Sequence, residues 1–248
     1  MSARYDTIGR SYTATRAPDP RIEAQIHAAL ADAESVVNVG AGSGSYEPRD
    51  RKVTAVEPSP VMRAQRSADS APCVEGVAEA LPFADDSFDA ALAILTLHHW
   101  SDWRAGAAEC RRVARERVVV FSWDPRVARR MWLGPEYFPG LWDDDVARFP
   151  TIAEQAAAFG AEQVEVVAIP HDCSDGFMGA HWRRPAAYLN PAVRAGISTF
   201  ALRSEEQLEP GLRALEDDLA SGAWAERHAD LLELDELDLG YRLLMTVM

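Results

Sequence analysis

Three glycines at alternate positions are the residues whose spacing points most directly to chemistry. Gly40, Gly42 and Gly44 follow a short apolar run at 36–39, in the segment VVNVGAGSG. A glycine-rich turn after a buried strand lets backbone N–H groups approach a ligand that a Cβ atom would keep away. A dinucleotide-binding turn needs Gly-x-Gly-x-x-Gly, and position 45 is Ser45. The spacing therefore indicates a nucleotide-like ligand but disfavours NAD.

A carboxylate follows the next apolar segment. Glu57 ends KVTAVE and is followed by Pro58. At the end of a second parallel strand a carboxylate can accept both hydroxyls of a ribose, which suits any adenosine ligand. An NAD-dependent oxidoreductase stays a less favoured alternative, because Lys52 is the only lysine and no Tyr-x-x-x-Lys pair exists.

Histidines supply the candidate general bases. His98 and His99 come directly after the apolar segment FDAALAILTL, whereas His171 and His181 flank the start of a long insertion. A hydroxyl acceptor profits from a base near its proton. We select His99 first and His171 second as catalytic candidates, and we assign His98 and His181 to substrate binding.

Aromatic side chains gather in two segments, the first of which begins at the end of the apolar segment RVVVFSW. Aromatic faces tolerate a cation and exclude water, so a lid over the acceptor is one interpretation. Packing of the insertion onto the sheet is the other. The candidate substrate-binding aromatics are Trp123, Trp132, Tyr137, Phe177 and Trp182.

Alternating strands and helices must position these residues. Buried strands are expected at 36–39, 52–58, 88–97, 117–123, 163–170 and 237–247. Helices are expected at 17–34, 59–66, 101–115 and 151–160, with Asp19, Ser59 and Ser101 as N-caps of the first three. Asn190-Pro191 and a capping box of Ser204 and Gln207 begin helices of the insertion. The alternation predicts an α/β fold with a parallel sheet covered on both faces.

Composition excludes several classes of function. The net charge of −14 argues against a nucleic-acid partner. Three widely spaced cysteines indicate neither a zinc site nor a disulfide framework, so no metal is expected. No apolar segment reaches the roughly 18 residues that a membrane span needs. We expect a reduced, soluble, cytoplasmic protein.

Four segments, in this order and spacing, resemble the class I S-adenosylmethionine-dependent methyltransferases. The resemblance is to the small-molecule branch that includes ubiquinone/menaquinone-biosynthesis-type enzymes (methyltransferase type 11), and it covers residues 4–125. The segments are YDTIGRSYTATR, VVNVGAGSG, VTAVEPSPVM and GVAEALPFADDSFDAALAILTLHHW. The resemblance implies a doubly wound, mostly parallel seven-stranded sheet of Rossmann-like type, with an antiparallel last strand and a helical lid insertion.

The resemblance also implies the cofactor, S-adenosylmethionine with S-adenosylhomocysteine as product, and the residues that hold it. The glycine turn would hold the methionine part, Glu57 the ribose, and Met62 the adenine face. The Leu95 carbonyl would meet the adenine amino group. The implied cofactor-binding residues are Tyr5, Tyr12, Arg16, Asn38, Gly40, Ala41, Gly42, Gly44, Glu57, Pro58, Met62, Ala78, Glu79 and Leu95.

Two positions depart from the family pattern. Asn38 stands where the family usually has Asp, so the site lacks that charge. Val77 stands where an Asp often accepts from the adenine amino group. A lost charge-assisted contact weakens binding by about 1–3 kcal/mol, which changes affinity rather than cofactor identity.

The predicted organisation is one methyltransferase domain, 1–248. Residues 1–18 would cover the cofactor, and 124–150 and 170–238 would form lid or substrate insertions. The predicted function is methyl transfer by in-line displacement to a small, apolar or aromatic acceptor, without nucleic acid or membrane, in a monomer or homodimer. A methyltransferase-fold protein that binds and regulates without turnover is the alternative.

Overall fold

A seven-stranded sheet forms the centre of the computed structural model, which describes residues 17–246. The strand order is β3-β2-β1-β4-β5-β9-β6, and β9 runs antiparallel to β5 and β6. The mostly parallel sheet with an antiparallel last strand is therefore confirmed. The strands of this sheet are β1 Ser35–Val39, β2 Lys52–Val56, β3 Cys73–Val74, β4 Phe88–Ile94, β5 Ala114–Trp123, β6 Gln163–Val166 and β9 Tyr241–Met245.

Helices cover both faces of the sheet, as the alternation predicts. Val36 of β1 packs in one apolar cluster with α3, whereas Val37 and Val39 pack in a second cluster with α5 and α8. Successive side chains of a strand point to opposite faces, so these two clusters are the two layers of the core. The helices that cover the sheet or connect its strands are α3 Pro20–Ala29, α4 Pro60–Ala64, η2 Leu97–His99, α5 Trp103–Val113 and α8 Ile152–Phe159.

Most predicted helix starts are confirmed, and one is wrong. Asp19 and Ser59 accept hydrogen bonds from the first turns of α3 and α4. The cap of α5 is Asp102, whose Oδ1 accepts from the N–H groups of Arg104 and Ala105 at 3.1 Å, and not Ser101. The hydroxyl of Ser101 donates instead to Glu79.

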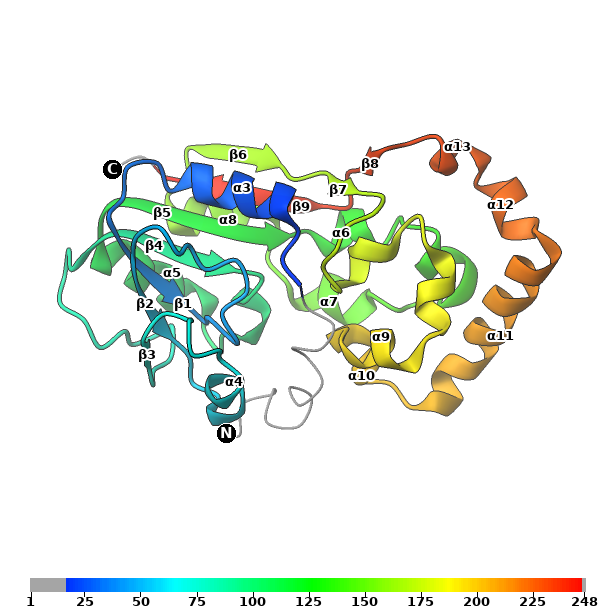
Figure 1. The fold of residues 1–248 in the computed structure, drawn as a ribbon, viewed down its shortest axis with the longest axis horizontal. Helices are drawn as coiled ribbons and strands as arrows, with labels where there is room; N and C mark the ends of the chain where they lie inside the picture. Colours follow the sequence, from blue (N-terminus) through cyan, green and yellow to red (C-terminus); the bar gives the residue numbers. More distant parts are fainter. Residues whose placement is uncertain (1–16, 247–248) are drawn as a thin grey trace.

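The segments between β5 and β9 are mainly helical. Apart from α8, which covers the sheet, Figure 1 shows these helices gathered beyond the end of β5, with α9 to α13 forming a lobe beside the sheet. A two-stranded ribbon of β7 Ile169–Pro170 and β8 Glu236–Leu237 closes the ends of the longer insertion. The helices are α6 Pro125–Ala128, η3 Leu133–Tyr137, α7 Asp143–Arg148, η4 Met178–His181, η5 Pro185–Leu189, α9 Pro191–Ala195, α10 Ser198–Ala201, α11 Glu205–Ser221, α12 Ala223–Arg227 and α13 Ala229–Leu232.

Candidate functional site

The glycine turn lies at the carboxyl end of β1, as predicted. Gly40, Gly42 and Gly44 have φ angles of +69°, +53° and +95°, a backbone region that residues other than glycine rarely adopt. A Cβ on Gly40 would lie 2.1 Å from Thr96 Oγ1, at the end of β4. The turn and β4 thus approach each other closely. The N–H groups of Gly40 and Gly44 donate to the carbonyls of Val56 and Ala41 at 2.8 and 2.9 Å, so the turn is fixed by hydrogen bonds within the protein. Ala41 also takes part, since its N–H donates to the Val56 carbonyl at 3.0 Å.

Glu57 joins the end of β2 to the glycine turn. Its Oε2 accepts from the Gly42 N–H at 2.9 Å, and its Oε1 accepts from the Ser59 N–H at 2.8 Å. Burial raises the pKa of this carboxyl above its ordinary value. A carboxylate has about four acceptor positions, so each oxygen retains one for a ribose hydroxyl. The Pro58 carbonyl accepts from Arg63 Nη1 at 2.8 Å, which fixes the chain after Glu57.

Asn38 carries a buried acceptor atom that no described group satisfies. The side chain is 1% exposed, and its Nδ2 donates to Glu47 Oε1 at 3.0 Å. Its Oδ1 has no hydrogen-bond partner among the described residues. A buried polar atom without a partner is costly, so a ligand with an N–H donor would stabilise this position. The ammonium group of S-adenosylmethionine is such a donor, and the residues present fit this cofactor.

Met62 and Leu95 border the same edge of the sheet. Met62 is 2% exposed, and its Cε lies 3.4 Å from the position of a Cβ on Gly42. Leu95 directly follows β4 with a φ of +46°, and its N–H donates to the Phe121 carbonyl at 2.8 Å. Such strain in a non-glycine residue is typical of functional positions. The roles of both residues toward the adenine stay predictions.

Glu79 has partners within the protein that the sequence did not indicate. Its Oε1 accepts from the Ser101 N–H at 2.6 Å, the Ser101 hydroxyl at 2.8 Å and the Asp102 N–H at 3.0 Å. This carboxylate therefore fixes the start of α5. Its neighbour Ala78 is 5% exposed and packs in the same apolar cluster as Trp100.

The candidate bases lie on two different elements. His98 and His99 occupy η2 directly after β4, with ring centroids 3.7 Å apart, and the His98 ring contacts Phe149. This position is at the carboxyl edge of the sheet, where the glycine turn also lies. His171 follows β7 instead, and its N–H donates to the Asp235 carbonyl at 2.8 Å.

His181 is the buried histidine of the insertion. The residue is 9% exposed, and neither ring nitrogen has a hydrogen-bond partner among the described residues. Burial, with the Arg184 charge nearby, lowers the pKa of the imidazole to about 4. The ring is therefore neutral at pH 7 and offers one donor and one acceptor to a ligand.

The candidate substrate-binding aromatics are mostly core residues. Trp132 Nε1 donates to the Trp182 carbonyl at 2.8 Å, and Trp182 Nε1 donates to the Ile169 carbonyl at 2.9 Å. The Tyr137 hydroxyl donates to Asp218 Oδ2 at 2.7 Å. Their polar groups are thus engaged within the protein, and their rings can offer a ligand only apolar surface. Exposed fractions are 4% for Trp132, 6% for Tyr137, 5% for Phe177 and 0% for Trp182, while Trp123 is partly buried.

Tyr5, Tyr12 and Arg16 lie outside the described residues. The sequence interpretation missed two charged residues at the site, Glu47 and Arg66, which form a buried ion pair at 2.7 Å beneath the glycine turn. Nineteen positions separate them, so no short-range spacing rule could have paired them.

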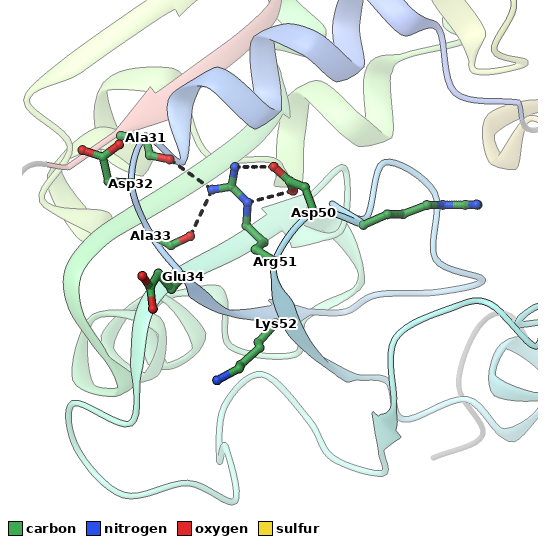
Figure 2. A pocket seen from close by; sticks show the side chains of 8 residues that line it. Ala31, Asp32, Ala33, Glu34, Asp50, Arg51 and Lys52 are labelled. Carbon is green, nitrogen blue, oxygen red and sulfur yellow. Dashed lines mark hydrogen bonds and ion pairs between the residues drawn. The ribbon is translucent and has the colours of Figure 1, made fainter.

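A polar pocket lies at the opposite edge of the sheet. Residues 31–34 and 49–52 line it, at the amino ends of β1 and β2 (Figure 2). Arg51 is already engaged there by the carbonyls of Ala31 and Ala33 at 3.1 Å each and by Asp50. Ligands of open α/β sheets bind at the carboxyl ends of strands, so this pocket is not the cofactor site. No group of three or more His, Cys, Asp or Glu side chains within residues 17–246 is placed to hold a metal ion. No helix in the same range has the length and apolar character to cross a membrane.

Comparisons with known proteins agree with this geometry. A family model described as a methyltransferase domain matches residues 37–121. A protein of Anabaena variabilis, assigned as a methyltransferase from an antibiotic biosynthesis pathway, is 37% identical, with a TM-score of 0.87 over 94% of this chain and 99% of that chain. A search of the curated proteins gives no match.

Two more distant structures share the fold alone. One, assigned as a methyltransferase of Bacillus halodurans, is 15% identical, with a TM-score of 0.55 over 90% of this chain and 96% of that chain. The other is the geranyl diphosphate C-methyltransferase of Streptomyces coelicolor in complex with S-adenosyl-L-homocysteine, at 13% identity and a TM-score of 0.50 over 92% and 77%. With the Anabaena relative, the glycine turn and Glu57, these findings lead to one conclusion. The chain belongs to the class I S-adenosylmethionine-dependent methyltransferases.

Proposed function

We propose that this methyltransferase transfers the methyl group of S-adenosylmethionine to a small, apolar or aromatic molecule by in-line displacement. The observation that carries the proposal is the pair of hydrogen bonds by which the Glu57 carboxylate holds the glycine turn and Ser59. That arrangement would put acceptor positions for a ribose beside the glycine turn. The unpartnered Oδ1 of Asn38 adds an acceptor for an ammonium group.

The cofactor would supply an activated methyl group on a sulfonium centre. The protein then has to bind the cofactor, align the acceptor and exclude water. These effects account for most of the rate enhancement in such a transfer. Asn38, Glu57 and Met62 would fix the cofactor at the carboxyl edge. Leu95, strained at φ +46°, would present its carbonyl to the adenine amino group.

The acceptor would enter between this edge and the helical lobe. The relative from an antibiotic biosynthesis pathway supports a small molecule, as does the apolar character of the rings in the lobe. We retain His99 as the first candidate base, because η2 lies at the same edge as the glycine turn, and His171 as the second. His181 offers the acceptor a neutral imidazole, and Trp123, Phe177 and His98 would add ring surface.

The proposal also covers the cellular compartment, the class of acceptor and the oligomeric state. The three cysteines, Cys73, Cys110 and Cys173, are free thiols, which supports a reducing compartment such as the cytoplasm. The net charge of −14 supports an acceptor other than nucleic acid. The protein would act as a monomer or homodimer.

Calorimetric titration with S-adenosylmethionine, S-adenosylhomocysteine and NAD tests the cofactor. We expect micromolar binding of the first two and none of NAD. Glu57→Gln should weaken the binding of both S-adenosyl compounds by at least about tenfold. The new side-chain amide would place an NH₂ donor against a backbone N–H group that now has an acceptor. Glu75→Gln is the matched control, because Glu75 also lies near Arg63 but is exposed and outside the turn.

Turnover separates the proposal from its alternative. Methylated product formed from a panel of small phenols, amines and activated carbon acids would support the transferase. Tight binding of S-adenosylhomocysteine without turnover on any acceptor would favour a binding or regulatory protein instead. Failure of the wild type to bind either S-adenosyl compound would refute the proposal.

A further inference from the structure

A buried ion pair lies beneath the glycine turn. Arg66 Nη2 donates to both carboxylate oxygens of Glu47 at 2.7 Å, and each side chain is only 5% exposed. Removing two charges from water is expensive, and an apolar pair of equal size is often as stable. Stability alone is therefore a weak explanation for this pair.

The pair also holds the backbone around it. Arg66 donates to the Gly42 carbonyl at 3.2 Å and to the Ala71 carbonyl at 3.0 Å. The Ala71 N–H donates in turn to Glu47 Oε2 at 3.2 Å. Glu47 and Arg66 are thus fixed with respect to the turn, and neither can change position without breaking several hydrogen bonds.

Glu47 in turn determines the orientation of the Asn38 amide. Nδ2 of Asn38 donates to Glu47 Oε1 at 3.0 Å, and the reverse orientation would place Oδ1 against a carboxylate. The unpartnered Oδ1 must therefore face away from Glu47. An amide donates on one side and accepts on the other, whereas an ionised Asp only accepts. An amide at position 38 can therefore donate to Glu47, whereas an ionised Asp could not.

We propose that Glu47 and Arg66 are positioning residues for the cofactor, which act by holding the Asn38 Oδ1 toward the ammonium group of S-adenosylmethionine. The inference rests on the proposed function. It predicts that an Asp at position 38 weakens binding, although a carboxylate would attract an ammonium more strongly in isolation. It also predicts that the amide and the carboxylate can exchange places. Asn38→Asp with Glu47→Gln conserves the local charge and the hydrogen bond between the two side chains, at the loss of one of the two contacts of Arg66 Nη2.

The test is calorimetric titration with two probes, S-adenosylhomocysteine and 5′-methylthioadenosine, which lacks the ammonium and carboxylate groups. Asn38→Asp and Glu47→Gln should each weaken S-adenosylhomocysteine by about tenfold or more and methylthioadenosine by less than about twofold. The double variant Asn38→Asp/Glu47→Gln should return S-adenosylhomocysteine to within about threefold of the wild type. Urea unfolding establishes that each variant is folded.

A second cycle covers the case in which Asn38→Asp does not fold. Asn38→Ala introduces no charge and should weaken S-adenosylhomocysteine by about tenfold. If Glu47 acts through Asn38, Glu47→Gln should then cause no further loss in the Asn38→Ala background. Additive losses, equal losses for both probes, or unchanged binding in Asn38→Asp would each overturn the inference and leave the proposed function standing. Absence of S-adenosylhomocysteine binding by the wild type would overturn both.

Discussion

Two buried polar residues, Asn38 and His181, have side-chain atoms that a ligand could contact. Asn38 and His181 are 1% and 9% exposed, and each has an atom without a hydrogen-bond partner among residues 17–246. Buried polar atoms are nearly always paired, so we expect a water molecule or a bound ligand to supply the missing hydrogen bond at each of these atoms. Asn38 lies at the cofactor end, and His181 lies in the insertion that we assign to the acceptor.

His181 should make stability depend on pH. Burial lowers its folded-state pKa to about 4, from 6.5 when unfolded, so the folded protein binds fewer protons between these values. The free energy of unfolding should therefore fall as the pH falls from about 6.5 to about 4, by about 2–3 kcal/mol for this group. Below the folded-state pKa its contribution should be constant. Urea unfolding of the wild type and of His181→Gln at a series of pH values measures this.

The difference between the two proteins isolates His181 from the carboxylates that titrate in the same range. The gap between the two unfolding free energies should change between pH 6.5 and 4 and be constant above pH 7. Parallel curves across the whole series would show that His181 keeps an ordinary pKa in the folded protein.

At the scale of secondary structure, the central strands could be predicted from the sequence, whereas β3 could not. The predicted strands at 163–170 and 237–247 are each interrupted, so that β7 and β8 are separate from β6 and β9. Apolar runs identify β1, β4 and β5, because strands buried on both faces need continuous apolar residues. β3 has two residues, Cys73 and Val74, and β7 and β8 also have two each. So short a segment has no periodicity, and its pairing depends on neighbours brought close by the tertiary fold.

The candidate site could likewise be predicted only where its sequence signals are local. The glycine turn and Glu57 are local signals and lie where the sequence predicts them. The roles of Glu47 and Glu79 depend on residues about twenty positions away, Arg66 and Ser101, and sequence spacing does not encode such pairs. The predicted N-cap of α5 is wrong by one residue. Ser101 and Asp102 are both good N-cap residues, and the position of Glu79 decides between them.

Helix α11 provides a test in which packing opposes helix propensity. Ala is a better helix former than Gly by about 1 kcal/mol, so Gly211→Ala would stabilise an isolated helix. In this protein a Cβ on Gly211 would lie 2.1 Å from the Tyr137 carbonyl oxygen and 2.6 Å from the Phe138 ring. Overpacking against backbone costs about 1–3 kcal/mol, so after the gain in helix propensity we expect a net destabilisation of up to about 2 kcal/mol in urea unfolding.

Asp217→Ala in the same helix is the control. Asp217 is exposed, so this substitution should change the free energy of unfolding by no more than about 0.5 kcal/mol. A stabilised Gly211→Ala variant would mean that α11 does not pack closely against η3 in solution.

At the scale of the whole molecule, Tyr46 joins the glycine turn to the insertion. Its hydroxyl donates to Asp175 Oδ2 at 2.8 Å and accepts from the Asp19 N–H at 3.3 Å, at the start of α3. The residue is 1% exposed and has a φ of +62°, a conformation that persists only where the surroundings impose it. Tyr46 therefore couples the glycine turn, α3 and the segment that leads to His181.

Tyr46→Phe should loosen this coupling. The substitution removes one partner from a buried carboxylate and one from a buried N–H, which costs about 1–3 kcal/mol of unfolding free energy. Because the hydroxyl connects two regions, amide hydrogen exchange should become faster both in residues 40–47 and in residues 171–176. Mass spectrometry of peptides from the exchanged protein measures the two regions separately.

Tyr188→Phe is the matched control, because it removes a buried hydroxyl whose bond stays within the insertion. That hydroxyl donates to the Met178 carbonyl at 2.7 Å, and Tyr188 is 0% exposed. We expect a comparable loss of stability, about 1–2 kcal/mol, with faster exchange in the insertion alone. Faster exchange of residues 40–47 in Tyr188→Phe as well would attribute the effect to general loosening, and unchanged exchange there in Tyr46→Phe would remove Tyr46 as the connection. The expected contrast between the two variants would show that the glycine turn and the insertion are mechanically coupled. Under the proposed function, binding of S-adenosylmethionine at the turn would then also order the insertion.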